Sequence, residues 1–313
     1  MRRARILPTA LLATAALAFA GCGVQYSGGG EGPLKGAQIA FGSKSFTEQK
    51  VLGQIAVQYL RHEGADVWDQ TGLVSSAAVR SSLEKGDIDA YWEYTGTAWL
   101  TYFGNDKPIP DPDEQFDAVA KEDREKNGID WIDRAPLNNT YALAIAGDRA
   151  KELGIDSLGQ LKEFLTTDDG KQATFCVAAE FANRPDGFPG VQRSYGFKVP
   201  GSRIKRLDEG LIYSQTANGT CTFGAVFETD GRIKGLDLTT LKDPERFFPP
   251  YSGAISIRSD KLREHPQIER LMKPIAEKLT TAKMQELNAK VDIDGQLPDK
   301  VAKDWLETEG FTD

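Results

Sequence analysis

The stretch that decides the fold runs from Gly86 to Phe103 and reads GDIDAYWEYTGTAWLTYF. Gly86 ends the helical pattern AAVRSSLEK, and the next residues alternate as a strand does, with Trp92 on the apolar side. A small polar turn from Tyr94 to Thr97 ends this strand, and a second, aromatic helical pattern follows. We expect most of these rings to lie in the core. Tyr94 differs because a tyrosine on a turn can present its face to a ligand.

Strands and helices alternate before this stretch. Residues 37–41 and 65–73 have strand patterns, and residues 75–85 form a helical pattern between the second and third strands. This β-α-β-α-β order predicts a parallel sheet in an α/β lobe. Ser45 and Glu48 match a capping box at the start of the first helix, with Ser45 as the cap. Lys44 then lies at a helix N-terminus, where it either holds an anion or is simply solvated.

The first residues have the features of an export signal. Three arginines precede an apolar run from Ile6 to Ala20, which is shorter than a membrane-spanning helix requires. The run ends in FAGC, which is similar to a bacterial lipobox and predicts a signal peptide over 1–21 and a lipidated Cys22. The alternative is an ordinary cleaved signal with an incidental cysteine. Residues 22–36 are rich in Gly and Ser and predict a flexible tether, so we expect an extracytoplasmic lipoprotein on the outer face of the membrane.

Composition excludes several classes of function. The formal net charge is −8 and no basic run is present after the N-terminus, which argues against nucleic-acid binding. The two histidines stand beside no serine or cysteine motif, and the sequence has no phosphate-binding glycine loop and no metal-ligand spacing. We therefore expect no enzyme, no cofactor and no metal. An acid/base hydrolase using the carboxylates near Glu93 stays a minor alternative.

Two cysteines remain after Cys22, namely Cys176 and Cys221. Both lie in strand-like segments, TFCVAA and GTCTFGAVF. Outside the cytoplasm such a pair can persist as a disulfide. The sequence therefore predicts either a bridge or two buried thiols.

Several motifs, in order along the chain, resemble those of the osmoprotectant-importer substrate-binding proteins, which are the glycine betaine/choline-binding proteins that feed ABC transporters. These motifs are GSKSFTE (42–48), GDID (86–89), EYTGT (93–97), NTY (139–141), EFANRPDG (180–187), TDGR (229–232) and FFPPY (247–251). The resemblance covers nearly all of the chain from Ala37 onward. It implies a two-lobed α/β fold, the type II periplasmic-binding-protein fold, with two crossover strands and a ligand cleft between the lobes. It also implies lobe 1 over 37–137 plus 234–313 and lobe 2 over 138–233, with crossovers near Asn139 and Asp230.

The resemblance also implies the ligand and its binding residues. A quaternary ammonium has no N–H group, so aromatic faces hold it through cation–π attraction. The implied aromatic cage consists of Tyr94, Tyr141, Phe227 and Tyr251. Phe227 departs from the family, in which tyrosine is usual at this position, and it keeps the ring while losing a hydroxyl. The implied carboxylate-binding and polar residues are Lys44, Thr97, Asn139 and Arg184.

The sequence thus predicts a membrane-tethered solute receptor that binds glycine betaine and delivers it to an ABC permease. A choline- or carnitine-specific receptor of the same fold is the alternative, and Lys44 and Arg184 argue against choline because it has no carboxylate. The relatives act as monomers, so a monomer is expected.

Overall fold

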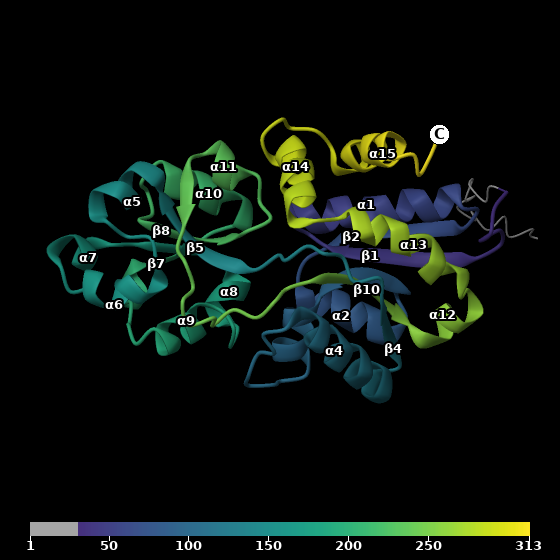
Figure 1. Cartoon of the computed structure of the whole chain (residues 1–313), viewed down its shortest axis with the longest axis horizontal. Coiled ribbons are helices and arrows are strands. Elements are labelled where there is room, and N and C mark those ends of the chain that lie inside the picture. Colours follow the sequence, from purple (N-terminus) through teal and green to yellow (C-terminus); the bar gives the residue numbers. More distant parts are fainter. Residues whose placement is uncertain (1–30) are drawn as a thin grey trace, which may run out of the picture.

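The computed structural model describes residues 31–313, which form two α/β lobes, each built on a five-stranded sheet (Figure 1). The predicted two-lobed α/β architecture is confirmed. The predicted signal peptide, the lipidated Cys22 and the first part of the tether lie outside the described residues.

Lobe 1 contains a mixed sheet, because one strand runs against the others. Its strands, in spatial order, are β2 (Asp66–Leu73), β1 (Gln38–Lys44), β3 (Ala90–Tyr94), β10 (Gly253–Arg258) and β4 (Ile129–Ile132). The predicted parallel pairing holds for β1 with β2 and β3, whereas β10 is antiparallel to both of its neighbours. Since β10 comes from late in the chain, lobe 1 contains both ends of the described polypeptide.

Helices cover both faces of this sheet. Figure 1 shows α1 above it and α2 and α4 below it. The helices of lobe 1 are α1 (Thr47–His62), α2 (Ser76–Lys85), α3 (Thr95–Thr97), a π-helical turn (Ala98–Tyr102), α4 (Pro112–Asn127), α12 (Ser259–Glu264), α13 (Gln267–Lys278), α14 (Thr281–Asp292) and α15 (Pro298–Thr308).

Local signals fix the helix that precedes β3. The Ser75 side chain accepts a hydrogen bond from the Ala78 N–H at 3.2 Å and so caps the start of α2. Gly86 ends the helix with φ at 79°, a left-handed conformation that glycine adopts without strain. The chain then enters β3 and leaves it through α3 and the π-helical turn, which places Tyr94 at the end of the strand.

The helix after β1 starts differently from the prediction. The capping box of Ser45 and Glu48 is wrong, because α1 begins at Thr47 and Phe46, which occupies the cap position, makes no side-chain cap hydrogen bond. Glu48 is buried, and its carboxylate is turned toward other side chains described below.

Lobe 2 contains the second sheet. Its strands, in spatial order, are β7 (Ile204–Arg206), β6 (Phe175–Val177), β8 (Phe223–Phe227), β5 (Tyr141–Ala146) and β9 (Leu238–Thr240). Its helices are α5 (Gly147–Leu153), a 3-10 turn (Leu158–Gln160), α6 (Leu161–Phe164), α7 (Asp168–Gln172), α8 (Ala179–Asn183), α9 (Phe188–Ser194), a 3-10 turn (Gly201–Arg203), α10 (Glu209–Ala217) and α11 (Arg232–Gly235). A disulfide joins Cys176 in β6 to Cys221 just before β8, with the two Cα atoms 5.8 Å apart.

Two crossover segments connect the lobes, and the second differs from the prediction. Strand β9 pairs with β5, with Leu238 opposite Ala146. The predicted boundary at 233/234 and the crossover near Asp230 are therefore wrong, since lobe 2 continues through β9 to Lys242, whose N–H donates to the Asp156 carbonyl of lobe 2, and the chain crosses back only after it. The crossovers meet at an antiparallel bridge between Asn138 and Ser252.

The last residues of the predicted tether belong to lobe 1. Leu34 is buried, and its N–H donates to the Glu63 carbonyl at 2.9 Å at the end of α1. The predicted end of the tether at residue 36 is therefore wrong, because Leu34 already packs on lobe 1. Across residues 31–313, the structure contains no helix with the length and apolarity that crossing a bilayer requires.

Candidate functional site

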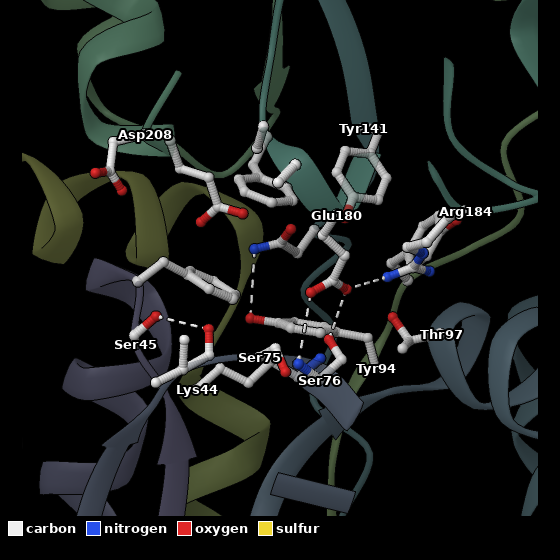
Figure 2. A pocket seen from close by; sticks show the side chains of 18 of the residues that line it. Lys44, Ser45, Ser75, Ser76, Tyr94, Thr97, Tyr141, Glu180, Arg184 and Asp208 are labelled. Carbon is white, nitrogen blue, oxygen red and sulfur yellow. Dashed lines mark hydrogen bonds and ion pairs between the residues drawn. The ribbon is translucent and has the colours of Figure 1, made fainter. Parts of the chain in front are cut away.

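A cavity of about 490 Å³ lies between the lobes and is lined by both of them (Figure 2). Lobe 1 contributes the carboxyl ends of β1 and β3, and lobe 2 contributes the start of β5, the end of β8 and helix α8. The structure brings all eight predicted ligand-binding residues to this cavity: Lys44, Tyr94, Thr97, Asn139, Tyr141, Arg184, Phe227 and Tyr251.

Aromatic rings form one continuous wall of the cavity. The Tyr141 ring centroid lies 4.8 Å from that of Phe227 and 5.6 Å from that of Tyr251, to which it is nearly perpendicular. Tyr141 and Phe227 meet because they are opposite each other in the antiparallel β5–β8 pair. Phe46 extends the wall, with its centroid 5.3 Å from Phe227 and 6.3 Å from Tyr94. We call these five rings the aromatic wall.

Sequence reasoning missed Phe46 as a member of this wall. The residue stands within GSKSFTE, beside Lys44, and its position at the cap of α1 turns the ring into the cavity. The position of Phe46 beside Lys44 could have indicated its role. An aromatic residue that precedes a helix is not needed for the apolar face of that helix, so another role is expected.

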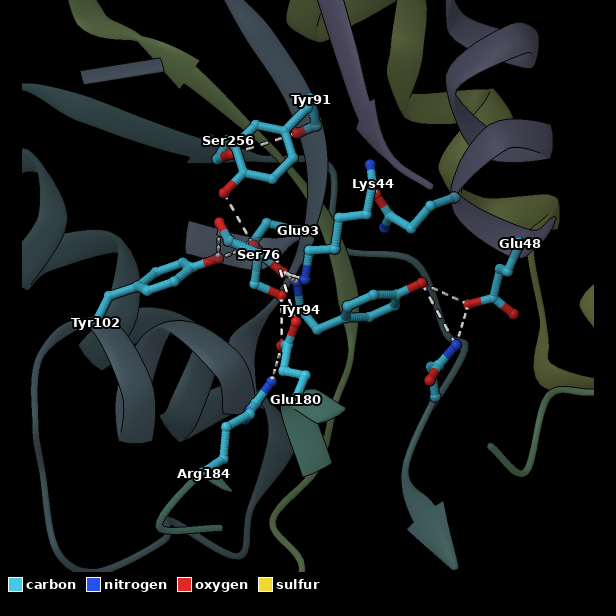
Figure 3. A network of polar contacts seen from close by, with 12 residues as sticks. Lys44, Glu48, Ser76, Tyr91, Glu93, Tyr94, Tyr102, Glu180, Arg184 and Ser256 are labelled. Carbon is cyan, nitrogen blue, oxygen red and sulfur yellow. Dashed lines mark hydrogen bonds and ion pairs between the residues drawn. The ribbon is translucent and has the colours of Figure 1, made fainter. Parts of the chain in front are cut away.

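Tyr94 is held in place through its hydroxyl, which donates to the Glu48 Oε1 atom at 2.7 Å (Figure 3). The Asn139 side-chain amide donates to the same oxygen at 2.5 Å, and the Asn288 amide donates to Oε2 at 3.0 Å. Burial raises the pKa of Glu48, and these hydrogen bonds oppose the shift. Glu48 therefore ties one ring of the aromatic wall to a crossover segment and to α14.

Lys44 is engaged by a carboxylate of its own lobe. Its Nζ atom donates to Glu93 Oε1 at 2.5 Å and lies 5.0 Å from the centroid of the Tyr94 ring. Glu93 is fully buried and also accepts from the hydroxyls of Tyr91 at 2.8 Å and Tyr102 at 2.5 Å (Figure 3). Four donors satisfy this carboxylate once the Tyr94 N–H, at 2.7 Å, is included.

Arg184 is engaged by two carboxylates of lobe 2. Its Nε and Nη2 groups donate to Asp186, the former at 2.8 Å, and its Nη1 group donates to Glu180 at 2.8 Å. Asp186 also accepts from the Tyr251 hydroxyl at 2.5 Å, and the guanidinium carbon lies 5.6 Å from the Tyr141 ring centroid. Arg184 and Asp186 thereby fix the positions of two rings of the wall.

Several other charged side chains of lobe 2 also line the cavity. Arg206, Asp208 and Glu209 line the cavity together with Glu180. Burial, followed by the charge of Glu180, raises the pKa of Glu209 to about 7. The cavity therefore combines an aromatic wall with an acidic side, an arrangement suited to a cationic group.

Within residues 31–313, no group of three or more His, Cys, Asp or Glu side chains is placed to hold a metal ion.

Comparison with known proteins gives consistent results. A family model described as the substrate-binding domain of ABC-type glycine betaine transport systems matches residues 37–308. The chain is 37% identical over 284 residues to a glycine-betaine-binding protein of Pseudomonas aeruginosa, covering 88% of this chain and 89% of that protein. It is 32% identical over 287 residues to the glycine betaine-binding protein YehZ of Escherichia coli, covering 90% of this chain and 93% of that protein.

A solved structure shares the fold over nearly its whole length. It is a crystal structure of a glycine betaine/carnitine/choline ABC transporter, with a TM-score of 0.71 and 25% sequence identity. The match covers 88% of this chain and 99% of that chain.

Proposed function

The chain belongs to the family of substrate-binding domains of ABC-type glycine betaine transport systems, and we propose that it binds a quaternary ammonium osmoprotectant, glycine betaine, in the cavity between its lobes. As a member of this family it is an extracytoplasmic solute receptor that works with a permease, and it is not an enzyme. Its fold is that of type II periplasmic binding proteins.

The observation that carries the proposal is the aromatic wall. A quaternary ammonium offers no hydrogen-bond donor, so a site for it needs ring faces, each contributing about 0.5–2 kcal/mol. Five rings supply such faces here. Two of them are held by carboxylates, Tyr94 by Glu48 and Tyr251 by Asp186, and the Arg184 guanidinium lies over the Tyr141 ring. This support gives the wall a fixed shape before ligand arrives, which lowers the cost of ordering the site.

The carboxylate of glycine betaine needs donors, and we assign Lys44, Thr97, Arg184 and Asn139 to this end of the ligand. All four line the cavity beside the aromatic wall. Lys44 and Arg184 each retain N–H groups beyond those bound to Glu93, Asp186 and Glu180.

Choline is the second candidate ligand, and one observation favours it. The ion pairs of Lys44 with Glu93 and of Arg184 with Asp186 reduce the positive charge available for a ligand carboxylate. Choline has no carboxylate and needs no such charge.

Delivery follows from the two-lobe architecture. The two crossover segments, which meet at the bridge between Asn138 and Ser252, form the hinge about which the lobes close over ligand, and the closed form is the one that docks on the permease. We further propose that Cys22 carries a lipid that anchors the receptor at the outer face of the membrane, and that the receptor works as a monomer.

Calorimetric titration of the purified receptor with glycine betaine and with choline tests the proposal. We expect saturable one-to-one binding of glycine betaine. Absence of heat with both ligands at millimolar concentration would refute a quaternary ammonium receptor.

A further inference from the structure

The Glu180 carboxylate lines the cavity and accepts a hydrogen bond from Arg184, one of the donors assigned above to the carboxylate of the ligand. Glu180 belongs to α8 of lobe 2, yet its Oε1 atom accepts a hydrogen bond from the Ser76 hydroxyl of lobe 1 at 2.8 Å. The same oxygen accepts from Arg184 Nη1 at 2.8 Å. Figure 2 shows this carboxylate pointing into the cavity, on the opposite side of the Tyr94 ring from Lys44.

The start of helix α2 also stabilises the Glu180 carboxylate at this point of the cavity. Ser76 is the first residue of α2, and its N–H lies 3.5 Å from Glu180 Oε2. The free N–H groups at a helix start carry partial positive charge and attract anions. Burial by itself would raise the pKa of Glu180, but the charges of Lys44 and Arg184 and the hydrogen bond from Ser76 hold that pKa below its ordinary value. Glu180 is therefore ionised at neutral pH.

The charges around it leave a negative excess. Lys44 and Arg184 supply two positive charges, whereas Glu93, Asp186 and Glu180 supply three negative charges in direct contact with them. A cationic ligand makes this cluster neutral. A zwitterion leaves the excess in place and brings a second carboxylate toward donors that Glu180 already uses.

We propose that Glu180 is a specificity-determining residue: its carboxylate competes with a ligand carboxylate for the donors of this subsite, which weakens the binding of glycine betaine and raises the relative affinity for choline-like cations. The inference rests on the proposed function of this cavity. Choline leaves the contact between Ser76 and Glu180 intact and gains a counter-ion. Glycine betaine binds only when its carboxylate shares or takes over the donors of Glu180.

The test compares the Glu180→Gln receptor with the unchanged receptor by calorimetric titration at pH 8. Glutamine keeps the size of the side chain and can still accept from Ser76, but it carries no charge. We expect tighter binding of glycine betaine and weaker binding of choline, so that the ratio of their Kd values shifts by about tenfold or more. An unchanged ratio, with both ligands binding, overturns this inference and leaves the proposed function intact. Failure of both ligands to bind the unchanged receptor refutes the proposed function itself.

Glu209→Gln is the matched control, because it removes one carboxylate from the same cavity wall. Glu209 is ionised at pH 8, above its pKa of about 7, and makes no hydrogen bond to Ser76 or Arg184 in the described structure. We expect it to shift the ratio of Kd values by less than about threefold. An equal shift in both variants would indicate a general charge effect and contradict competition for donors.

A second variant examines the donors themselves. Ser76→Ala, added to Glu180→Gln, removes the hydroxyl that the first substitution makes available to a ligand carboxylate. We expect the gain in glycine betaine affinity to shrink while choline affinity stays the same. A gain of unchanged size would contradict the assignment of Ser76 to the carboxylate subsite.

Discussion

Replacing Tyr141 by alanine should weaken ligand binding more than any conservative change at that position. The residue is 8% exposed, and its ring lies at the centre of the aromatic wall, in contact with Phe227 and Tyr251. Loss of one cation–π contact of about 0.5–2 kcal/mol corresponds to a Kd that rises by about 2- to 30-fold. Calorimetric titration with glycine betaine measures this change directly.

Two further variants separate ligand contact from structural damage. Tyr141→Phe keeps the ring face and should leave Kd within about threefold of its original value. Tyr59→Ala removes a buried tyrosine of lobe 1 that packs against Phe311 and does not line the cavity, so it should lower Tm while leaving Kd unchanged. Unchanged Kd in Tyr141→Ala, or equal losses in the alanine and phenylalanine variants, would refute the role of the ring face.

Three other predictions concern packing, pH and covalent stability. A Cβ atom at Gly96 would lie 2.8 Å from the Tyr251 ring, so Gly96→Ala should displace that ring and weaken ligand binding. The same substitution should lower the free energy of unfolding by about 1–3 kcal/mol, and with it Tm. The pKa of Glu209 is higher in the folded protein than in the unfolded chain. As pH rises, Glu209 therefore loses its proton at a lower pH in the unfolded chain. The free energy of unfolding should therefore fall as pH rises from 4.5 to about 7, by at most about 3 kcal/mol, and Glu209→Gln should lack this slope in denaturant titrations. Replacing Cys176 and Cys221 by alanine opens a 45-residue loop and should cost about 4 kcal/mol, and the same loss should follow reduction of the unchanged receptor.

The apolar pattern of the sequence was sufficient to locate the strands that carry the tyrosines of the site. Tyr94 ends strand β3 and Tyr141 begins strand β5, as the sequence predicted when it placed both residues at strand ends. Because strand ends of the two lobes face a common cleft in this fold, the resemblance was enough to bring these residues to one cavity.

The ion pairs of the site could not be predicted from local pattern. Lys44 and Glu93 are 49 residues apart, and Ser76 and Glu180 are 104 apart, so only the tertiary fold brings them together. The sequence predicted that Lys44 and Arg184 are available to bind a ligand carboxylate. The fold instead pairs each of them with a carboxylate of the protein. Charge in a cavity depends on these partners rather than on the residue types alone.

Two local predictions failed because tertiary contacts outweighed them. Glu48 stands at the third position of a capping box, but its carboxylate is turned to Tyr94 and Asn139 at the hinge. Strand β9 is three residues long and has no alternating pattern of useful length, so the end of lobe 2 was placed too early in the chain. Its pairing with β5 is a long-range contact that sequence spacing does not reveal.

Titration with choline and with its uncharged isostere, 3,3-dimethylbutan-1-ol, tests the central claim most directly. The two molecules have nearly the same shape, and the isostere has carbon in place of the quaternary nitrogen. The account predicts saturable binding of choline and affinity for the isostere that is lower by about tenfold or more, because the ring faces attract the charge. Equal affinity for the two molecules would contradict recognition of a quaternary ammonium by the aromatic wall.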